Sequence, residues 1–226
     1  LKTWFDFLNL GYKLPLVSGS DFPYVPIPGM PRTYVKVAGS FSAQGWFDGI
    51  KEGKTFVTNG PLLELSVNGR SIGDEVRVST GEDINVEASG FINLGAFKLT
   101  LLELYWQGDI VASARSEQGA DILRLRHSMP ANHGGWFVLK VTGEDESSKN
   151  AINRVAISSP IYINIDNKGF CKPSVITSVV SSLRKDMKKM VEKRVDEQME
   201  LSPWDTWQPR KQYWPKNKTL LEARIL

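Results

Sequence analysis

Cysteine and histidine are nearly absent from this sequence, and their scarcity restricts the chemistry that the chain can perform alone. In 226 residues there are one cysteine, Cys171, and two histidines, His127 and His133. A single cysteine excludes an internal disulfide and a cysteine-based zinc site. Catalytic zinc and binuclear hydrolase sites use several histidines together with carboxylates. We therefore expect this chain alone to bind no stoichiometric metal and to hold no complete catalytic centre.

Long apolar runs and the common nucleotide and hydrolase motifs are missing as well. No stretch approaches the roughly 20 uninterrupted apolar residues of a membrane helix, so no membrane span is predicted. The glycine spacings of dinucleotide- and phosphate-binding loops do not occur. Ser158-Ser159 lacks the flanking glycines of a serine-hydrolase elbow. The sequence leaves the compartment open, and an exported or periplasmic location is as compatible with it as a cytoplasmic one.

Neither sign of charge predominates, and the charge balance indicates which partners the chain can bind. The net charge is +3, with 41% apolar and 23% charged residues, the balance of an ordinary globular protein. Many of the basic residues fall between 184 and 194, where Asp186 and Glu192 accompany them on an expected helix. That mixture is typical of a solvated helix face, so we expect no nucleic-acid partner.

Residues 1–60 mix helix and strand patterns. An apolar stretch at 4–10 predicts a helix that ends at Gly11, and residues 14–17 predict a short buried strand. A second helix is expected at 42–52, with Ser42 as its N-cap. Helix, strand and a following acid, Asp21, are one unit of an α/β repeat, in which strand C-termini carry the chemistry.

Residues 61–166 change to a period of two, which indicates strands. Favoured turn residues separate them, including the hairpin dipeptide Asn68-Gly69 and the turn at 107–109. About seven strands with turns every 8–12 residues predict an immunoglobulin-like β-sandwich. Their expected ranges are 63–67, 84–88, 98–106, 110–115, 122–127, 136–142 and 155–165. The predicted fold class is therefore mainly β, with a remnant of an α/β barrel before the sandwich.

Residues 167–226 predict a long amphipathic helix and a C-terminal arm. The helix is expected at 173–200, beginning at Pro173-Ser174. Its apolar stripe either docks on the body of the protein or joins a second copy into a homo-oligomer. The arm combines aromatic residues with prolines and is expected to wrap a surface; its aromatics are Trp204, Trp207, Tyr213 and Trp214.

Three residues are candidates for a site. Asp21, directly after the expected strand, is either a ligand for a hard metal ion or an acid that caps its own turn. Arg32 either faces an anionic substrate or forms a structural ion pair. Asn59, in the sequence Asn59-Gly60-Pro61, either lines a substrate-binding rim or makes a plain turn. His127 is expected to share a strand face with Leu123 and Leu125, and His133 to lie in an exposed loop.

The N-terminal third of the chain resembles the PHP family (polymerase and histidinol phosphatase type), in its CehA/McbA-like metallohydrolase branch. Residues 7–21 resemble the last helix–strand unit of that barrel, and the resemblance is most specific in residues 45–61. It continues through other short runs, namely residues 28–35, 62–69, 73–74 and 158–162. The resemblance implies a metal-dependent hydrolase in which Asp21 is a late metal ligand. The family's early His-x-His pair and its mid-barrel ligands have no counterpart here.

The resemblance thus implies the C-terminal region of a hydrolase of ester, amide, carbamate or phosphoester bonds. The partner would be the N-terminal remainder of the barrel, and the full protein would carry a divalent metal such as zinc, manganese or iron. This chain alone is expected to be inactive. The alternative function is a non-catalytic sandwich that binds carbohydrate or protein through an aromatic set, Tyr105, Trp106, Trp136 and Phe137.

Overall fold

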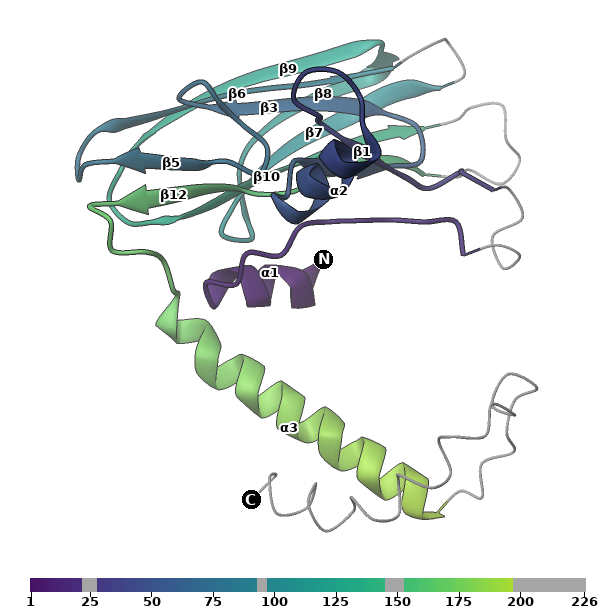
Figure 1. Ribbon diagram of the computed structural model, residues 1–226, viewed down its shortest axis with the longest axis vertical. Helices are drawn as coiled ribbons and strands as arrows, with labels where there is room; N and C mark the ends of the chain where they lie inside the picture. Colours follow the sequence, from purple (N-terminus) through teal and green to yellow (C-terminus); the bar gives the residue numbers. More distant parts are fainter. Residues whose placement is uncertain (22–27, 93–96, 145–152, 197–226) are drawn as a thin grey trace. The chain divides into compact units, whose positions relative to one another are not determined.

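Two β-sheets, antiparallel except for the parallel pair β12–β5, make up most of the structure, a computed structural model that describes residues 1–21, 28–92, 97–144 and 153–196 (Figure 1). In the described residues, one sheet has eight strands in the order β1-β2-β11-β10-β12-β5, with β7 pairing β10 and β8; the other has the order β4-β3-β6-β9. The predicted mainly β fold class is confirmed. The strands are β1 (Arg32–Val35), β2 (Thr55–Thr58), β3 (Leu62–Val67), β4 (Arg70–Ser71), β5 (Glu75–Val78), β6 (Asp83–Phe91), β7 (Lys98–Trp106), β8 (Asp109–Ala120), β9 (Ile122–Pro130), β10 (Gly135–Glu144), β11 (Arg154–Ser158) and β12 (Ile161–Ile165).

The main core lies between the two sheets. Alternate side chains of β3 and β6 point inward because successive residues of a strand face opposite ways. They meet apolar side chains from β7, β10 and β12; among them Val67, Ile84, Leu102, Leu139 and Ile161 are fully or almost fully buried. Each such side chain contributes about 1.5–3 kcal/mol by leaving water. The alternation read from the sequence therefore locates this core correctly.

Strand β10 is buried on both faces. Phe137 and Leu139 face the main core, whereas Trp136 and Val138 pack against a helix, α1 (Lys2–Asn9). The uninterrupted apolar run of β10 is what a strand covered on both sides requires. The predicted helix at 4–10 is confirmed, and Gly11 follows it with a φ of +88°. Helix α1 thus covers the outer face of the eight-stranded sheet.

The turn signals were confirmed where they were strongest. Asn68 and Gly69 both adopt positive φ and join β3 to β4, as a tight hairpin turn requires. Gln107 and Gly108 do the same between β7 and β8. The second predicted helix is α2 (Ala43–Lys51), whose N-cap Ser42 accepts a hydrogen bond from the backbone N–H of Gly45 at 3.0 Å.

Two expected strands were wrong. Residues 14–17 form no strand; the segment is extended, and Leu14 and Val17 are 37% and 59% exposed. The single strand expected at 155–165 is two strands, because the chain is interrupted at Ser159-Pro160 and pairs first with β2 and then with β5. The division expected at residue 60 also crosses a sheet, since β2 is hydrogen-bonded to β11, and β1 is hydrogen-bonded to β2. An α/β barrel unit is not seen in residues 1–21 and 28–60, the part of this region that the structure describes.

Residues 1–172 form one compact unit, and the second begins with α3 (Pro173–Asp196). This confirms the predicted start of the long helix; residues 197–200 and the aromatic arm at 201–226 lie outside the described residues. Ile176, Val180 and Leu183, the first three residues of the predicted stripe, are 40–44% exposed. Docking and self-association through this stripe both stay predictions. None of the described helices has the length and apolar character needed to cross a membrane.

Candidate functional site

The β1–β2 ladder brings two of the predicted site residues to the same end. Arg32 is the first residue of β1 and pairs across the ladder with Thr58, the last residue of β2. Asn59 follows Thr58 directly. Arg32 is exposed, and no ion pair joins its guanidinium to any described residue. The structural ion pair that was one interpretation of Arg32 is therefore not seen within the described residues.

Asp21 is reached by a segment that runs beside this ladder. The Thr33 hydroxyl bridges both backbone groups of Ser18, accepting from its N–H at 2.8 Å and donating to its carbonyl at 3.0 Å. The Thr55 hydroxyl, at the far end of β2, donates to the Leu16 carbonyl at 2.7 Å. The chain from 16 to 18 thus advances toward the end that holds Arg32. Asp21, three residues on, is exposed in a turn with a φ of +48°.

The corner at Thr58-Asn59-Gly60-Pro61 ends the run at 45–61, and its hydrogen bonds explain why Thr and Asn stand at residues 58 and 59. Thr58 Oγ1 accepts from Gly60 N–H at 2.9 Å and donates to the Pro61 carbonyl at 2.5 Å. Asn59 Oδ1 accepts from Val155 N–H at 2.6 Å, and its Nδ2 donates to the Asn153 carbonyl at 3.0 Å. These bonds turn the chain from one sheet to the other. A substrate-binding role for Asn59 stays a prediction, with its amide engaged by β11.

The glycines of the same run are required by close backbone packing. A Cβ on Gly49 would come within 2.5 Å of Val35 Cγ1. Gly73 has a φ of +86°, and a Cβ there would come within 2.7 Å of the Glu52 carbonyl oxygen. Such contacts are shorter than van der Waals packing allows. The runs 45–61 and 73–74 therefore fold as one packed unit, which fixes the ladder that carries Arg32.

The described residues do not supply a complete set of metal ligands. Among them, no three His, Cys, Asp or Glu side chains are grouped so as to hold a metal ion. His127 lies on β9 on the face of Leu123 and Leu125, as expected, and His133 is exposed with its ring against Trp106 at 5.8 Å between centroids. The described residues do not complete a metal site around Asp21, and its role as a carboxylate ligand stays a prediction.

The aromatic set proposed for ligand binding is mostly core. Trp136 and Phe137 are fully buried, and Trp106 is 7% exposed. Tyr105 is half-buried against α1, where burial raises the pKa of its hydroxyl to about 12. These rings stabilise the fold, and none of the three most buried offers a free face to a sugar.

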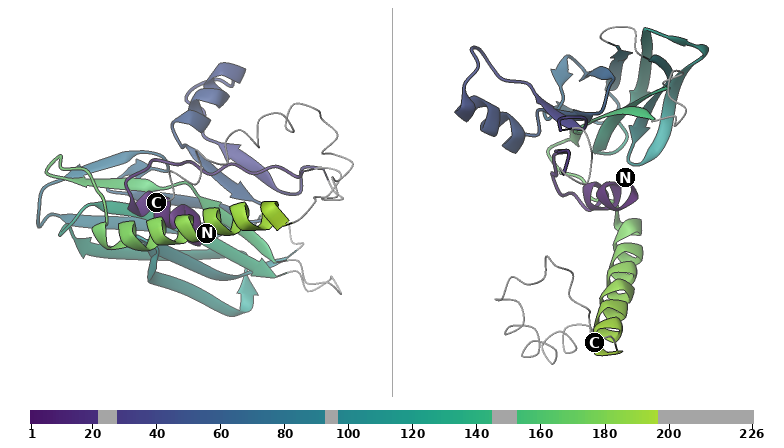
Figure 2. Two further views of the ribbon diagram at one scale, coloured as in Figure 1. Left: turned by 90° about the horizontal axis from the view of Figure 1, so that it is seen from below. Right: turned by 90° about the vertical axis from the view of Figure 1, so that its right-hand side faces the viewer.

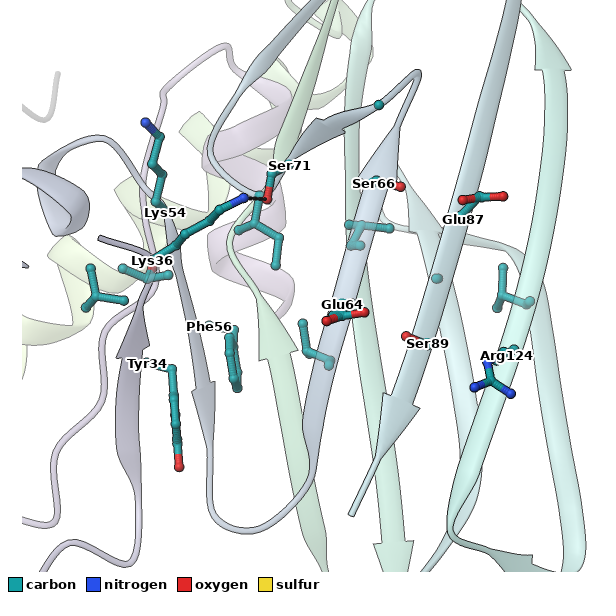
Figure 3. A pocket seen from close by; sticks show the side chains of 18 of the residues that line it. Tyr34, Lys36, Lys54, Phe56, Glu64, Ser66, Ser71, Glu87, Ser89 and Arg124 are labelled. Atoms are coloured by element: carbon teal, nitrogen blue, oxygen red, sulfur yellow. Dashed lines mark hydrogen bonds between the residues drawn. The ribbon is translucent and has the colours of Figure 1, made fainter. Parts of the chain in front are cut away.

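A groove that the sequence did not indicate lies between the β1–β2 ladder and the outer face of β3, β6 and β9 (Figure 3). Its volume is about 670 Å³. Tyr34 and Phe56, cross-strand partners, stack along one side with ring centroids 4.9 Å apart and planes 7° apart. Glu64, Ser89 and Arg124 form the opposite side. The signal that was missed is the run of strand-favouring residues Thr33-Tyr34-Val35, which would have predicted β1 and placed Tyr34 on one face with Arg32.

Comparisons with known proteins found no matching family model and no matching curated protein. Solved structures with some likeness include the solution structure of a CARDB domain from Pyrococcus furiosus, at 19% identity over 46% of this chain and 94% of that one, with a TM-score of 0.29. The crystal structure of that domain in complex with di-metal ions is 18% identical over 47% of this chain and 94% of that one, with a TM-score of 0.27. The neutron crystallographic structure of a Jonesia denitrificans lytic polysaccharide monooxygenase is 9% identical over 67% of this chain and 87% of that one, with a TM-score of 0.26. These scores are too low to bear on fold or function.

Proposed function

We propose that this chain is the C-terminal region of a metal-dependent hydrolase. Residues 1–60 would complete an α/β barrel formed mostly by preceding polypeptide, and the following strands would be its accessory, immunoglobulin-like sandwich. Asp21 would supply one metal ligand. The bond hydrolysed would be an ester, amide, carbamate or phosphoester.

The observation that carries this proposal is the extended apolar segment at 14–17. It has no strand partner among the described residues, and side-chain hydroxyls hold it in place at Leu16 and Ser18. Leu14 and Val17 are left largely exposed. Large apolar side chains left in water favour a missing neighbour. A strand of the barrel would provide that neighbour on the side of this segment away from β1 and β2.

Helix α2 points to the same partner. Figure 2 shows α2 projecting from the side of the sandwich, and its only buried residue is Gly49. Phe47 on this helix is 54% exposed, and Phe41 just before it is 79% exposed. Large aromatic side chains left in water in this way favour a further layer of protein against residues 41–47.

The proposed roles follow from position. In an α/β barrel, the residues just after each strand line the active-site mouth, which is where Asp21 stands relative to residues 14–17. Arg32, exposed at the start of β1, would contact an anionic group of the substrate. Asn59 would hold the rim through its bonds to β11. A metal held by the complete protein would activate the attacking water.

The test compares the full-length protein with this chain. The reading frame upstream of Leu1 should encode a His-x-His segment, and the purified full-length protein should contain zinc, manganese or iron by elemental analysis. Asp21→Asn should lower the metal content and the hydrolysis of nitrophenyl ester and phosphate substrates. Arg32→Ala should raise KM for the anionic substrate with little change in metal content.

Asp83→Asn offers a matched control, since Asp83 is an exposed acid at the start of β6. It should leave both metal content and activity unchanged. The proposal fails if the upstream sequence lacks the histidine pair. It also fails if Asp21→Asn retains full metal content and full activity.

A further inference from the structure

The side of the groove opposite Tyr34 and Phe56 contains two rows of polar residues. The rows differ in whether their acid and arginine form an ion pair. We define the Glu64 row as Glu64, Ser89 and Arg124, which are successive cross-strand partners on β3, β6 and β9. The Glu87 row, one step along the same strands, consists of Ser66, Glu87 and Arg126.

In the Glu87 row the acid and the arginine satisfy each other. They are adjacent, and Arg126 Nε forms an ion pair with Glu87 Oε1 at 3.1 Å. In the Glu64 row Ser89 stands between the two charges, and neither Glu64 nor Arg124 forms an ion pair with a described residue. The Glu64 row therefore presents a free carboxylate, a hydroxyl and a free guanidinium in line.

These groups are placed to bind hydroxyls. A carboxylate accepts hydrogen bonds, a guanidinium donates them in a fixed plane, and a serine hydroxyl does both. Two strand spacings, about 9.5 Å in all, separate the Cα atoms of Glu64 and Arg124, which suits two linked pyranose rings. The row is balanced in charge, so it favours a neutral ligand.

The stacked rings supply the apolar contact that a sugar requires. Figure 3 shows Tyr34 and Phe56 standing parallel on one side of the groove, with Glu64, Ser89 and Arg124 on the other. Tyr34 is 40% exposed. The C–H face of a pyranose packs on an aromatic ring as other apolar groups do. From these contacts we propose that the groove binds a neutral oligosaccharide.

Two other ligand classes fit the groove less well. A nucleic acid requires cationic contacts along its phosphates. Of the four cations among the described residues that line the groove, Lys54 and Arg126 are paired with acids, and Glu64 and Glu87 would repel phosphate groups. An extended peptide is bound mainly through main-chain hydrogen bonds to a strand edge. The Glu64 row instead runs across three paired strands and offers side chains. The proposal is independent of the hydrolase assignment, because it needs neither Asp21 nor a metal.

The test is calorimetric titration of the purified chain with cellohexaose, xylohexaose, mannohexaose and chitohexaose. At least one should bind with a Kd between about 10 μM and 1 mM. Arg124→Ala and Glu64→Gln should each weaken that binding roughly tenfold, and Tyr34→Leu should do the same. Arg126→Ala and Glu87→Gln, which alter exposed residues of the same strands, should change the Kd less than about twofold.

Three outcomes would overturn the inference. One is the absence of binding by all four hexasaccharides at about 5 mM. Another is an equal loss of affinity for the sugar in the variants of the Glu64 row and in those of the Glu87 row, which would show that the Glu64 row is not the specific contact. The third is tighter binding of single-stranded DNA or of an extended peptide than of any sugar. Thermal unfolding of each variant verifies that it is folded, so a loss of binding reports on the groove.

Discussion

The indole N–H of Trp136 donates a hydrogen bond to Asn9 Oδ1 at 3.0 Å, and both residues are buried. The Nδ2 of the same amide donates to the Gln107 carbonyl at 3.1 Å. Asn9 is the last residue of α1, and its own carbonyl accepts from Lys172 N–H at 2.7 Å. One side chain therefore joins the end of α1 to β10 and to the β7–β8 turn.

Replacing Asn9 by alanine should destabilise the protein substantially. Asn9→Ala leaves the Trp136 indole N–H and the Gln107 carbonyl without their partner, and unpaired buried groups are costly. We expect a loss of about 2–3 kcal/mol in the free energy of unfolding, measured with urea. Lys2→Ala, which removes only the exposed ion pair to Asp6, should cost less than about 0.5 kcal/mol. Similar losses in the two variants would show that the buried amide does not anchor α1.

Gly73 should tolerate no side chain. Besides its positive φ, Gly73→Ala would place a Cβ 2.6 Å from the Gly53 carbonyl carbon and 2.7 Å from the Glu52 oxygen, so the backbone after α2 would have to move. We expect a loss of roughly 3 kcal/mol or more. Gly69 has a similar φ but open space around it, so Gly69→Ala should cost only about 1 kcal/mol. Equal losses of stability in Gly73→Ala and Gly69→Ala would mean that the close contact of residue 73 with the backbone of residues 52 and 53 is relieved without strain.

Glu75 should make stability depend on pH in the acid range. A hydrogen bond from Lys13 at 2.7 Å, with others from Arg77 and Asn164, lowers the pKa of its carboxyl from 4.5 to about 2. Because the folded pKa is the lower one, the stabilisation is present above pH 4.5 and is lost as the pH falls toward 2.

We therefore expect Glu75→Gln to lower stability at pH 7 by about 1–2 kcal/mol, allowing for solvent screening. The difference from the unmodified protein should disappear in urea unfolding near pH 2. Glu87→Gln, at a more exposed ion pair, should change stability by less than about 0.5 kcal/mol at either pH. A difference for Glu75→Gln that persists unchanged in acid would contradict the assignment.

The sequence predicted the sandwich better than the region before it, for a physical reason. Strands such as β3 and β6 alternate because one face is buried and the other is wet, so their pattern is local. Residues 14–17 are as apolar as a buried strand, yet they are extended and exposed. Whether an apolar segment joins a sheet depends on neighbours, which local patterns do not contain.

The site was predicted only in part for a similar reason. Arg32 and Asn59 do lie at one end of a ladder, but β1 and β2 were not expected as strands. The pairing of β2 with β11 joins residues about a hundred positions apart, and no short-range signal encodes it. The Glu64 row also depends on cross-strand register. The hairpin dipeptides indicate turns, whereas long-range register follows from packing.

Ser159 and Thr55 should control the order of the segment that leads to Asp21. Leu16 N–H donates to Ser159 Oγ at 2.8 Å, and Thr55 Oγ1 donates to the Leu16 carbonyl at 2.7 Å. Since the Thr55 proton is thus committed, Ser159 donates the bond of 2.7 Å between the two hydroxyls. The three groups form a closed ring in which each donor has an acceptor.

Ser159→Ala opens this ring and removes the acceptor of Leu16 N–H. We expect amide hydrogen exchange at Leu16 to accelerate by about tenfold or more, with a global loss of only about 1–2 kcal/mol. Ser66→Ala, a hydroxyl lost from the outer face of β3, should leave exchange at Leu16 unchanged. If exchange at Leu16 stays slow in Ser159→Ala, other contacts hold the segment. The position of Asp21 would then depend on the neighbours of residues 14–17 rather than on this ring.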